Sequence, residues 1–196
     1  RLCDDALGRE DLLTLATEIE GHPDNVSPAL CGGLTISYMA DREVVVCPCR
    51  ISMPLKVAVV LPAAKKESTS QTRKLFPRKV DLADALHNQS RTAAIVAGLL
   101  QGDLKQGRTL FDDRLHQRQR CVLMPWLFHA IEAAYDAGAL GAFLSGAGPA
   151  VAALCRTEDL AVVLEAMDAA ISAQGMPNRR FGLDIAAEGA EFLSVR

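Results

Sequence analysis

Three short stretches of this sequence carry side chains whose types and spacing could do chemistry. The first covers residues 18–25 and reads Glu-Ile-Glu-Gly-His-Pro-Asp-Asn. Glu18 and Glu20 stand where a predicted helix ends, and acidic groups there are mildly unfavourable against the helix dipole. They suit a cation such as Mg²⁺, which takes one or two carboxylates plus phosphate oxygens and water. The structural alternative is a polar turn in which Asp24 or Asn25 caps the next helical turn.

The second stretch is a polar and basic segment over residues 63–79, in which Thr69 precedes Arg73 by four residues. On a helical turn this spacing puts the hydroxyl and the guanidinium on one side. A guanidinium binds a carboxylate or phosphate as a planar fork, so the segment could hold a small anion. Further along, residues 113–120 read Asp-Arg-Leu-His-Gln-Arg-Gln-Arg, directly before an apolar helix. For both segments, an ordinary solvated link is the structural alternative.

The third stretch is Ser-Gly-Ala-Gly-Pro at residues 145–149, between two apolar segments. Small residues let a backbone approach a ligand closely, and successive amides can form a nest for an anion. A tight connection between two strands is the alternative interpretation.

Hydrophobic periodicity predicts the elements that position these stretches. Helices are expected at 10–20, 82–100, 104–111, from Pro125 to Gly138 and at 160–171. Strands are expected at 34–39, 42–46, 57–61, 139–144, 151–154 and 181–185, with another after it at 192–195 and a hairpin through Ala40-Asp41. The predicted apolar stripes are Leu12, Leu15, Ala16 and Ile19 in the first helix and Leu82, Leu86, Ala93, Val96 and Leu100 in the second. From residue 54 the order predicts an α+β domain, an antiparallel sheet covered by helices on one face.

Composition excludes several classes of protein. The 196 residues carry 21 basic and 24 acidic side chains, a formal net charge of −3, so no nucleic-acid partner is expected. No apolar run reaches the length of a membrane span, so no membrane partner is expected either. The six cysteines show no zinc spacing, and most of those other than Cys47 and Cys49 lie in apolar runs, which indicates buried free thiols and a reducing, cytoplasmic location. The chain opens on Arg1 without a targeting segment, so we expect a fragment, and an organellar location stays open.

Taken in order, these segments resemble the homoserine kinases of the GHMP kinase superfamily. Residues 20–33, Glu-Gly-His-Pro-Asp-Asn-Val-Ser-Pro-Ala-Leu-Cys-Gly-Gly, are similar to that family's substrate-side motif, and residues 144–149 to the superfamily's third motif. Residues 68–77 resemble its Thr…Arg…Pro loop, and residues 113–120 its Asp-x-x-His-Gln-x-x-Arg stretch. Four matches in register cover nearly the whole chain.

The resemblance implies a role for each position. The homoserine pocket would be lined by His22, Asp24, Asn25, Arg73 and Arg120. One of the arginines would hold the α-carboxylate, and Thr69 and Arg73 would be the catalytic pair, with Thr69 near the transferred phosphate. Glu18, or Glu20 in its place, would bind Mg²⁺. The loop beside the phosphates would be formed by Ser145, Gly146, Ala147 and Gly148.

The resemblance also implies a fold and a reaction. Residues 1–53 would be the end of a GHMP kinase N-terminal domain, and residues 54–196 a ferredoxin-like C-terminal domain. With ATP and Mg²⁺, a homodimer would transfer the γ-phosphate to the side-chain hydroxyl of L-homoserine in threonine biosynthesis. The family's Pro-x-x-x-Gly-Leu-Gly-Ser-Ser-Ala phosphate loop does not occur here, so we expect the chain to be inactive alone. The alternatives are another GHMP kinase, such as mevalonate kinase, or a non-catalytic binding protein that keeps the pocket.

Overall fold

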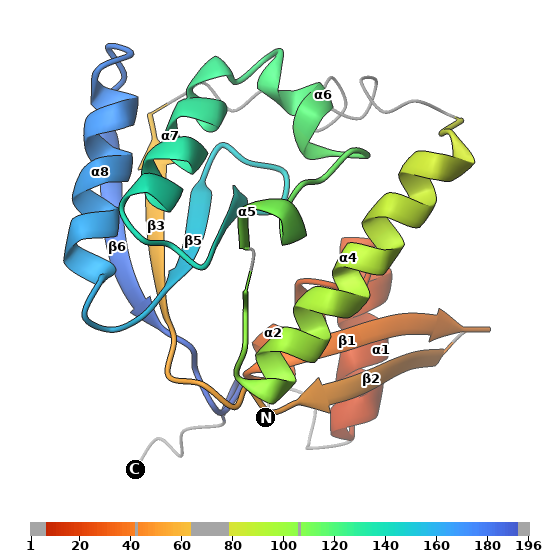
Figure 1. Cartoon of the computed structure of the whole chain (residues 1–196). Coiled ribbons are helices and arrows are strands. Elements are labelled where there is room, and N and C mark those ends of the chain that lie inside the picture. The colour runs from red at the N-terminus through yellow and green to blue at the C-terminus, as the bar shows by residue number, and fades with distance from the viewer. Residues whose placement is uncertain (1–6, 42, 64–78, 106, 192–196) are drawn as a thin grey trace. The chain divides into compact units, whose positions relative to one another are not determined.

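The computed structural model describes residues 7–41, 43–63, 79–105 and 107–191 (Figure 1). The described residues form two compact units. The first contains the residues up to Ile51 together with those from Ile185 on, and the second is Ser52–Asp184. The division differs from the expected one, because the chain after Asp184 joins the first unit instead of continuing the second.

The first unit contains two helices and a hairpin. These elements are α1 (Arg9–Glu20), α2 (Val26–Cys31), β1 (Leu34–Ala40) and β2 (Glu43–Cys49). α1 ends at Gly21, whose left-handed conformation lets its N–H donate to the carbonyl of Thr17 at 2.7 Å. In the hairpin, Ala40 pairs with Glu43 across Asp41. The predicted first helix and the predicted hairpin are therefore confirmed.

The predicted apolar stripe of α1 is wrong. The buried side chains of this helix are Leu13 and Thr17, whereas Leu15 is exposed and Ile19 is 80% exposed. Leu13 and Thr17 lie one turn apart on the same side, and α1 contacts α2 and β2. Hydropathy misplaces the stripe because a threonine occupies one of the two buried positions.

Residues 186–189, which follow the second unit along the chain, pack against Gly32 and Gly33. Gly33 donates its N–H to the carbonyl of Ala186 at 2.7 Å. Gly32 has a φ of +76°, and a Cβ there would lie 2.5 Å from the carbonyl carbon of Glu188. Glycine is required at this position by both the backbone conformation and the close approach of the 186–189 segment.

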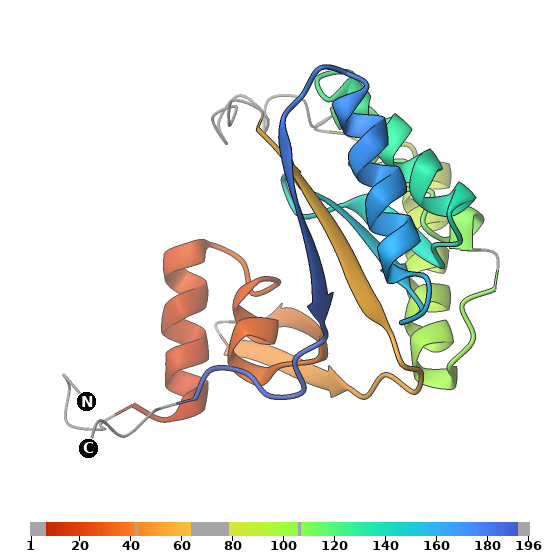
Figure 2. The ribbon, with the colours of Figure 1, turned by 90° about the vertical axis from the view of Figure 1, so that its left-hand side faces the viewer.

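The second unit contains a four-stranded antiparallel sheet with helices on one face (Figure 2). Its strands are β3 (Lys56–Pro62), β4 (Gly141–Leu144), β5 (Val151–Cys155) and β6 (Asn178–Asp184), in the spatial order β4-β5-β3-β6. Helices α7 (Pro125–Asp136) and α8 (Leu160–Ser172) lie side by side against the sheet. The predicted α+β class and the ferredoxin-like arrangement are confirmed.

The core of the second unit lies between this sheet and the two helices. It contains Ala58, Val60, Leu127, Ile131, Val163, Met167 and Ile171. Burial along β3 alternates, with Ala58, Val60 and Pro62 buried and their neighbours half-buried. Burial alternates because the helices cover only one face of the sheet.

Three further helices precede α7. They are α4 (Leu82–Gln101), α5 (Gly107–Leu110) and α6 (Gln117–Cys121). α5 is shorter than the helix expected over 104–111, and α6 was not predicted.

The predicted apolar stripe of α4 is wrong, since Leu82, Leu86 and Leu100 are all exposed. The helix packs on the 109–114 segment through polar side chains instead. Asn88 donates to the carboxylate of Asp113, and Arg91 donates to a backbone carbonyl of the same segment. The spacing of apolar residues does not identify a helix face that packs through hydrogen bonds.

The five described cysteines are all unpaired. Cys155 is buried, which confirms the expectation for that thiol, and Cys47 is exposed on β2. Among the described residues, no helix is both long and apolar enough to cross a membrane.

Candidate functional site

The structure places the predicted site residues in two groups. In the first unit, Glu18 and Glu20 lie in the last turn of α1, and His22, Asp24 and Asn25 lie between α1 and α2. Arg120 and the 145–148 loop lie in the second unit. Thr69 and Arg73 fall outside the described residues.

In the first group, the turn between the two helices engages its own polar side chains. His22 Nδ1 contacts Asp24 Oδ1, which also accepts the N–H of Asn25 at 2.8 Å. Asn25 occupies the position before α2, yet its side chain makes no capping bond. The predicted side-chain cap is therefore absent, and the Asp24 carboxylate orders the turn. Both His22 and Asp24 remain accessible, with 44% and 73% of their side chains exposed.

The two candidate Mg²⁺ carboxylates are exposed at the end of α1. Glu18 and Glu20 are two residues apart, and helical side chains at that spacing do not face each other. A single ion could therefore meet only one of them. No group of three or more His, Cys, Asp or Glu side chains within residues 7–41, 43–63, 79–105 and 107–191 could hold a metal. A single carboxylate matches Mg²⁺ bound mainly through phosphate oxygens and water, and it does not match a protein cage.

In the second group, the 145–148 loop connects β4 to β5. The Ser145 N–H donates to the carbonyl of Ala150, and the Gly148 N–H to that of Ser145, both at 2.9 Å. Gly146 has a φ of +54° with open space around it. Within the described chain, the N–H groups of Gly146 and Ala147 donate no hydrogen bond. Two successive amides in this state can bind an anion such as a phosphate group.

Arg120 lies against this loop. Its side chain is buried, with 4% of the residue exposed, and Nη1 donates a hydrogen bond to the carbonyl of Ala147. Burial lowers the pKa of Arg120, but a guanidinium stays charged in proteins. A positive charge is thus held next to the two free amides of the loop.

A second side chain of α6 holds the same loop. Gln117 Oε1 accepts the backbone N–H of Leu144, the last residue of β4, at 2.9 Å. Arg120 and Gln117 therefore hold the loop in place by hydrogen bonds on both sides of Gly146. The role of Gln117 was not predicted, although it lies in the charged stretch over residues 113–120.

Asp113 orders the start of α6. Its two carboxylate oxygens accept the backbone N–H groups of Leu115, His116 and Gln117 at 2.8–3.0 Å, and Asn88 on α4 donates to Oδ1 at 2.7 Å. Burial raises the pKa of Asp113, but the hydrogen bonds from Asn88 and the three amides outweigh it and leave the pKa below its ordinary value. Asp113 thus ties α6 to α4, a contact that motif spacing could not reveal.

His116 lies between this carboxylate and Arg120. Burial and then the charge of Arg120 lower the pKa of His116, against an opposing effect of Asp113, whose Oδ2 lies 3.7 Å from Nδ1. The imidazole is therefore neutral at physiological pH and adds no second positive charge beside Arg120.

The sequence is similar to those of known kinases. Residues 95–173 match the family described as GHMP kinases C terminal. The chain is 36% identical to the homoserine kinase of Desulfitobacterium hafniense over 184 residues, which are 94% of this chain and 62% of that protein. It is 42% identical to the homoserine kinase of Thermus thermophilus over 170 residues, which are 86% of this chain and 57% of that protein. The chain therefore spans about three-fifths of the length of these relatives.

The structure is also similar to a solved structure. It superposes on the crystal structure of homoserine kinase from Cytophaga hutchinsonii with a TM-score of 0.87 and 28% identity, covering 96% of this chain and 61% of that one. In its sheet order and in these matches the chain is similar to the GHMP kinases, and residues 95–173 match their C-terminal domain.

Proposed function

We propose that the protein containing this chain is a homoserine kinase, which transfers the γ-phosphate of ATP to the side-chain hydroxyl of L-homoserine. The observation that carries the proposal is the contact between Arg120 and Ala147, because it places an arginine directly beside a loop with free amides. The names of the two relatives and of the solved structure support the choice of homoserine.

The proposed roles follow the chemistry of phosphoryl transfer, which depends on positioning and charge neutralisation more than on covalent chemistry. The free amides of Gly146 and Ala147 would hold phosphate oxygens, and Thr69 would lie near the transferred group. The homoserine pocket would contain His22, Asp24, Asn25, Arg73 and Arg120. No general base is required by this scheme.

The cofactors are part of the proposal. Glu18, or Glu20 in its place, would hold Mg²⁺, which supplies charge neutralisation on the ATP phosphates when bound. Arg73 or Arg120 would bind homoserine, because a guanidinium can bind the α-carboxylate of an amino acid through two parallel hydrogen bonds. We also propose a homodimer that acts in threonine biosynthesis in the cytoplasm, with residues 1–53 and 54–196 as its domain parts.

A competition between acceptors tests the function. The natively expressed protein is supplied with ATP, Mg²⁺ and either L-homoserine or mevalonate, and ADP release is followed by a coupled assay. The proposal expects ADP release with homoserine and none above background with mevalonate. Turnover of mevalonate alone would assign the chain to another GHMP kinase. Binding of homoserine without any ADP release would favour the non-catalytic alternative.

A further inference from the structure

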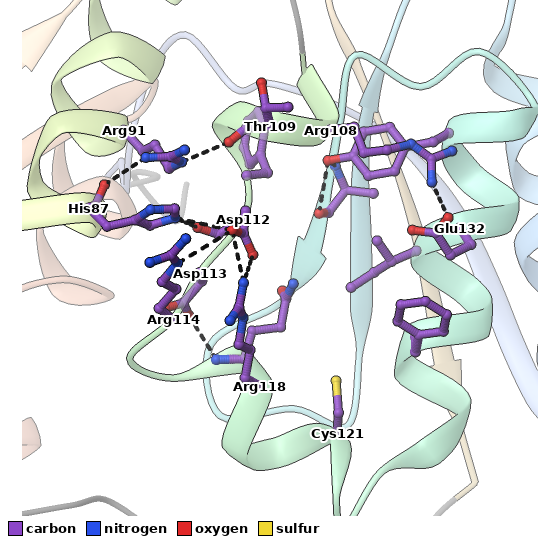
Figure 3. A pocket seen from close by; sticks show the side chains of 16 residues that line it. His87, Arg91, Arg108, Thr109, Asp112, Asp113, Arg114, Arg118, Cys121 and Glu132 are labelled. Atoms are coloured by element: carbon purple, nitrogen blue, oxygen red, sulfur yellow. Dashed lines mark hydrogen bonds and ion pairs between the residues drawn. The ribbon is translucent and has the colours of Figure 1, made fainter. Parts of the chain in front are cut away.

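A cavity of about 440 Å³ lies in the second unit. It opens between α4, the segment before α6, α7 and β4 (Figure 3). Its size falls in the range of about 300–1,000 Å³ typical of small-molecule pockets. Arg120 and the 145–148 loop do not line it. Gln117 lines the cavity, but the two free amides of the loop do not, so the proposed phosphate contacts lie outside it.

Part of the cavity lining is charged, and most of its charges are neutralised by neighbours. Asp112 lies 3.1 Å from His87 and 3.0 Å from Arg118. Glu132 pairs with Arg108, whose guanidinium also contacts Asp136. Because these carboxylates already have cationic partners, they add little repulsion toward an incoming anion.

Arg91 differs from the other cations of this lining. Its Nε donates to the carbonyl of Thr109 at 2.8 Å, and Nη1 donates to the carbonyl of His87 at 3.3 Å. Over the described part of the chain, Arg91 pairs with no carboxylate. A guanidinium has five N–H donors, so this partly buried charge keeps donors for a ligand. Figure 3 shows the group on the cavity wall beside His87 and Asp112.

The rest of the cavity lining is largely apolar. It is formed by Phe111, Phe128, Ile131 and the ring of Tyr135. The ring of Phe111 is stacked on Phe143 with their centroids 5.4 Å apart, which holds this part of the wall in place. Phe128 is 58% exposed and lines the cavity, so its ring is accessible to a ligand.

Tyr135 contributes no negative charge to this lining. Its hydroxyl accepts the N–H of Ala142 at 3.0 Å. Burial raises the pKa of Tyr135 to about 12, so the phenol is neutral at physiological pH.

We propose that this cavity binds a small monocarboxylic acid with an aromatic or branched aliphatic body. The carboxylate pairs with Arg91, and the body packs on Phe111, Phe128 and Ile131. A single negative charge matches the single cation without a counter-charge. A phosphate dianion would instead bring a second negative charge toward Asp112. The observations that support this site do not rest on the proposed kinase function.

The test uses 3-phenylpropionate as the probe and 3-phenylpropan-1-ol as its uncharged control, with titration calorimetry on the natively expressed protein. The acid is expected to bind, and the alcohol to bind about tenfold more weakly. Arg91→Gln is expected to weaken binding of the acid about tenfold, and Arg91→Lys less. Arg180→Gln, on β6 outside the cavity, serves as the matched control and should leave binding unchanged.

Cys121 reports on the location of the probe, because its side chain lies in the cavity lining. Alkylation of Cys121 by iodoacetamide, followed by peptide mass spectrometry, should slow in the presence of the acid. Alkylation of the exposed Cys47 should not change. Excess L-homoserine should leave the protection of Cys121 intact, which separates this site from the homoserine pocket.

Phe128→Ser provides a second variant that should fold, since the side chain is largely exposed. It is expected to weaken binding of the acid by removing part of the apolar lining. Equal binding by wild type and Arg91→Gln, equal protection of Cys121 by the acid and the alcohol, or no protection at all would each overturn the proposal.

Discussion

Gln117 Oε1 accepts the backbone N–H of Leu144 at 2.9 Å, and so joins α6 to the end of β4 directly before the glycine loop. Three residues later on the same helix, Arg120 donates to the carbonyl of Ala147 within that loop. The short helix α6 thus positions both the arginine proposed to bind homoserine and the loop proposed to bind phosphate. Changes on α6 can therefore be sorted by which of the two they disturb.

Gln117→Leu is expected to raise the KM for ATP more than the KM for homoserine. The substitution removes the acceptor of the Leu144 N–H, and Leu144 is buried, so the folded protein loses about 1–3 kcal/mol. Gln117→Glu keeps an acceptor at the same position and should stay closer to wild type in the KM for ATP. Steady-state kinetics for both substrates measure the effect. An unchanged KM for ATP in Gln117→Leu would contradict the positioning role.

Arg120→Ala is expected to raise both KM values. The loss of a buried charge-assisted contact costs about 2–5 kcal/mol, which raises the KM for homoserine by about thirtyfold or more. The KM for ATP rises as well because the carbonyl of Ala147 loses its donor. Arg120→Lys keeps a charge and a donor without the fork, so it should restore the KM for ATP more than that for homoserine. Full recovery of the KM for homoserine in the lysine variant would argue against carboxylate binding.

Asp113→Asn is expected to lower the free energy of unfolding by about 1.5–3 kcal/mol at neutral pH, because charge-assisted bonds to three amides and Asn88 are lost. The folded pKa of Asp113 lies below the unfolded value of about 3.9, so this stability is present above that value and is lost as the pH falls through the folded pKa. Urea unfolding at neutral pH and in acid should therefore show a difference that shrinks in acid. Asp136→Asn, at an exposed carboxylate, is the control. A difference that persists in acid would contradict this origin.

Tyr135→Phe is expected to destabilise the protein by about 1–3 kcal/mol at neutral pH, since the N–H of the fully buried Ala142 loses its acceptor. Burial raises the folded pKa of Tyr135 to about 12, whereas an unfolded tyrosine ionises near about 10. Ionisation therefore favours the unfolded state as the pH rises above the unfolded value, and the advantage of wild type should shrink there. Tyr38→Phe, at an exposed tyrosine, should show no such trend. Thermal melts across alkaline pH measure both variants.

Much of the fold was predictable from the sequence, because the residues that begin and end helices and the spacing of apolar core residues are local features of the chain. Gly21 and Gly102 end helices where expected, and Pro125 begins α7. The buried faces of α7 and α8 follow apolar periodicity because both helices pack on a sheet through apolar side chains. The strand order then follows from the ferredoxin-like arrangement.

The rest depended on contacts between residues far apart in the chain. α4 packs through Asn88 and Arg91, which periodicity assigns to the surface. The motif over residues 113–120 predicted that Arg120 matters, but its contact with Ala147 spans 27 residues and leaves no local pattern. The turn at His22 and Asp24 was found from its residue types, whereas the bond between those two side chains required coordinates.

The central claim is that this protein phosphorylates L-homoserine. Phosphorus NMR of the natively expressed protein with ATP, Mg²⁺ and L-homoserine measures the transfer itself. The account predicts a new phosphomonoester resonance that grows in step with ADP and is split by the adjacent methylene protons. Formation of ADP with inorganic phosphate alone, or no change in the spectrum, would contradict it.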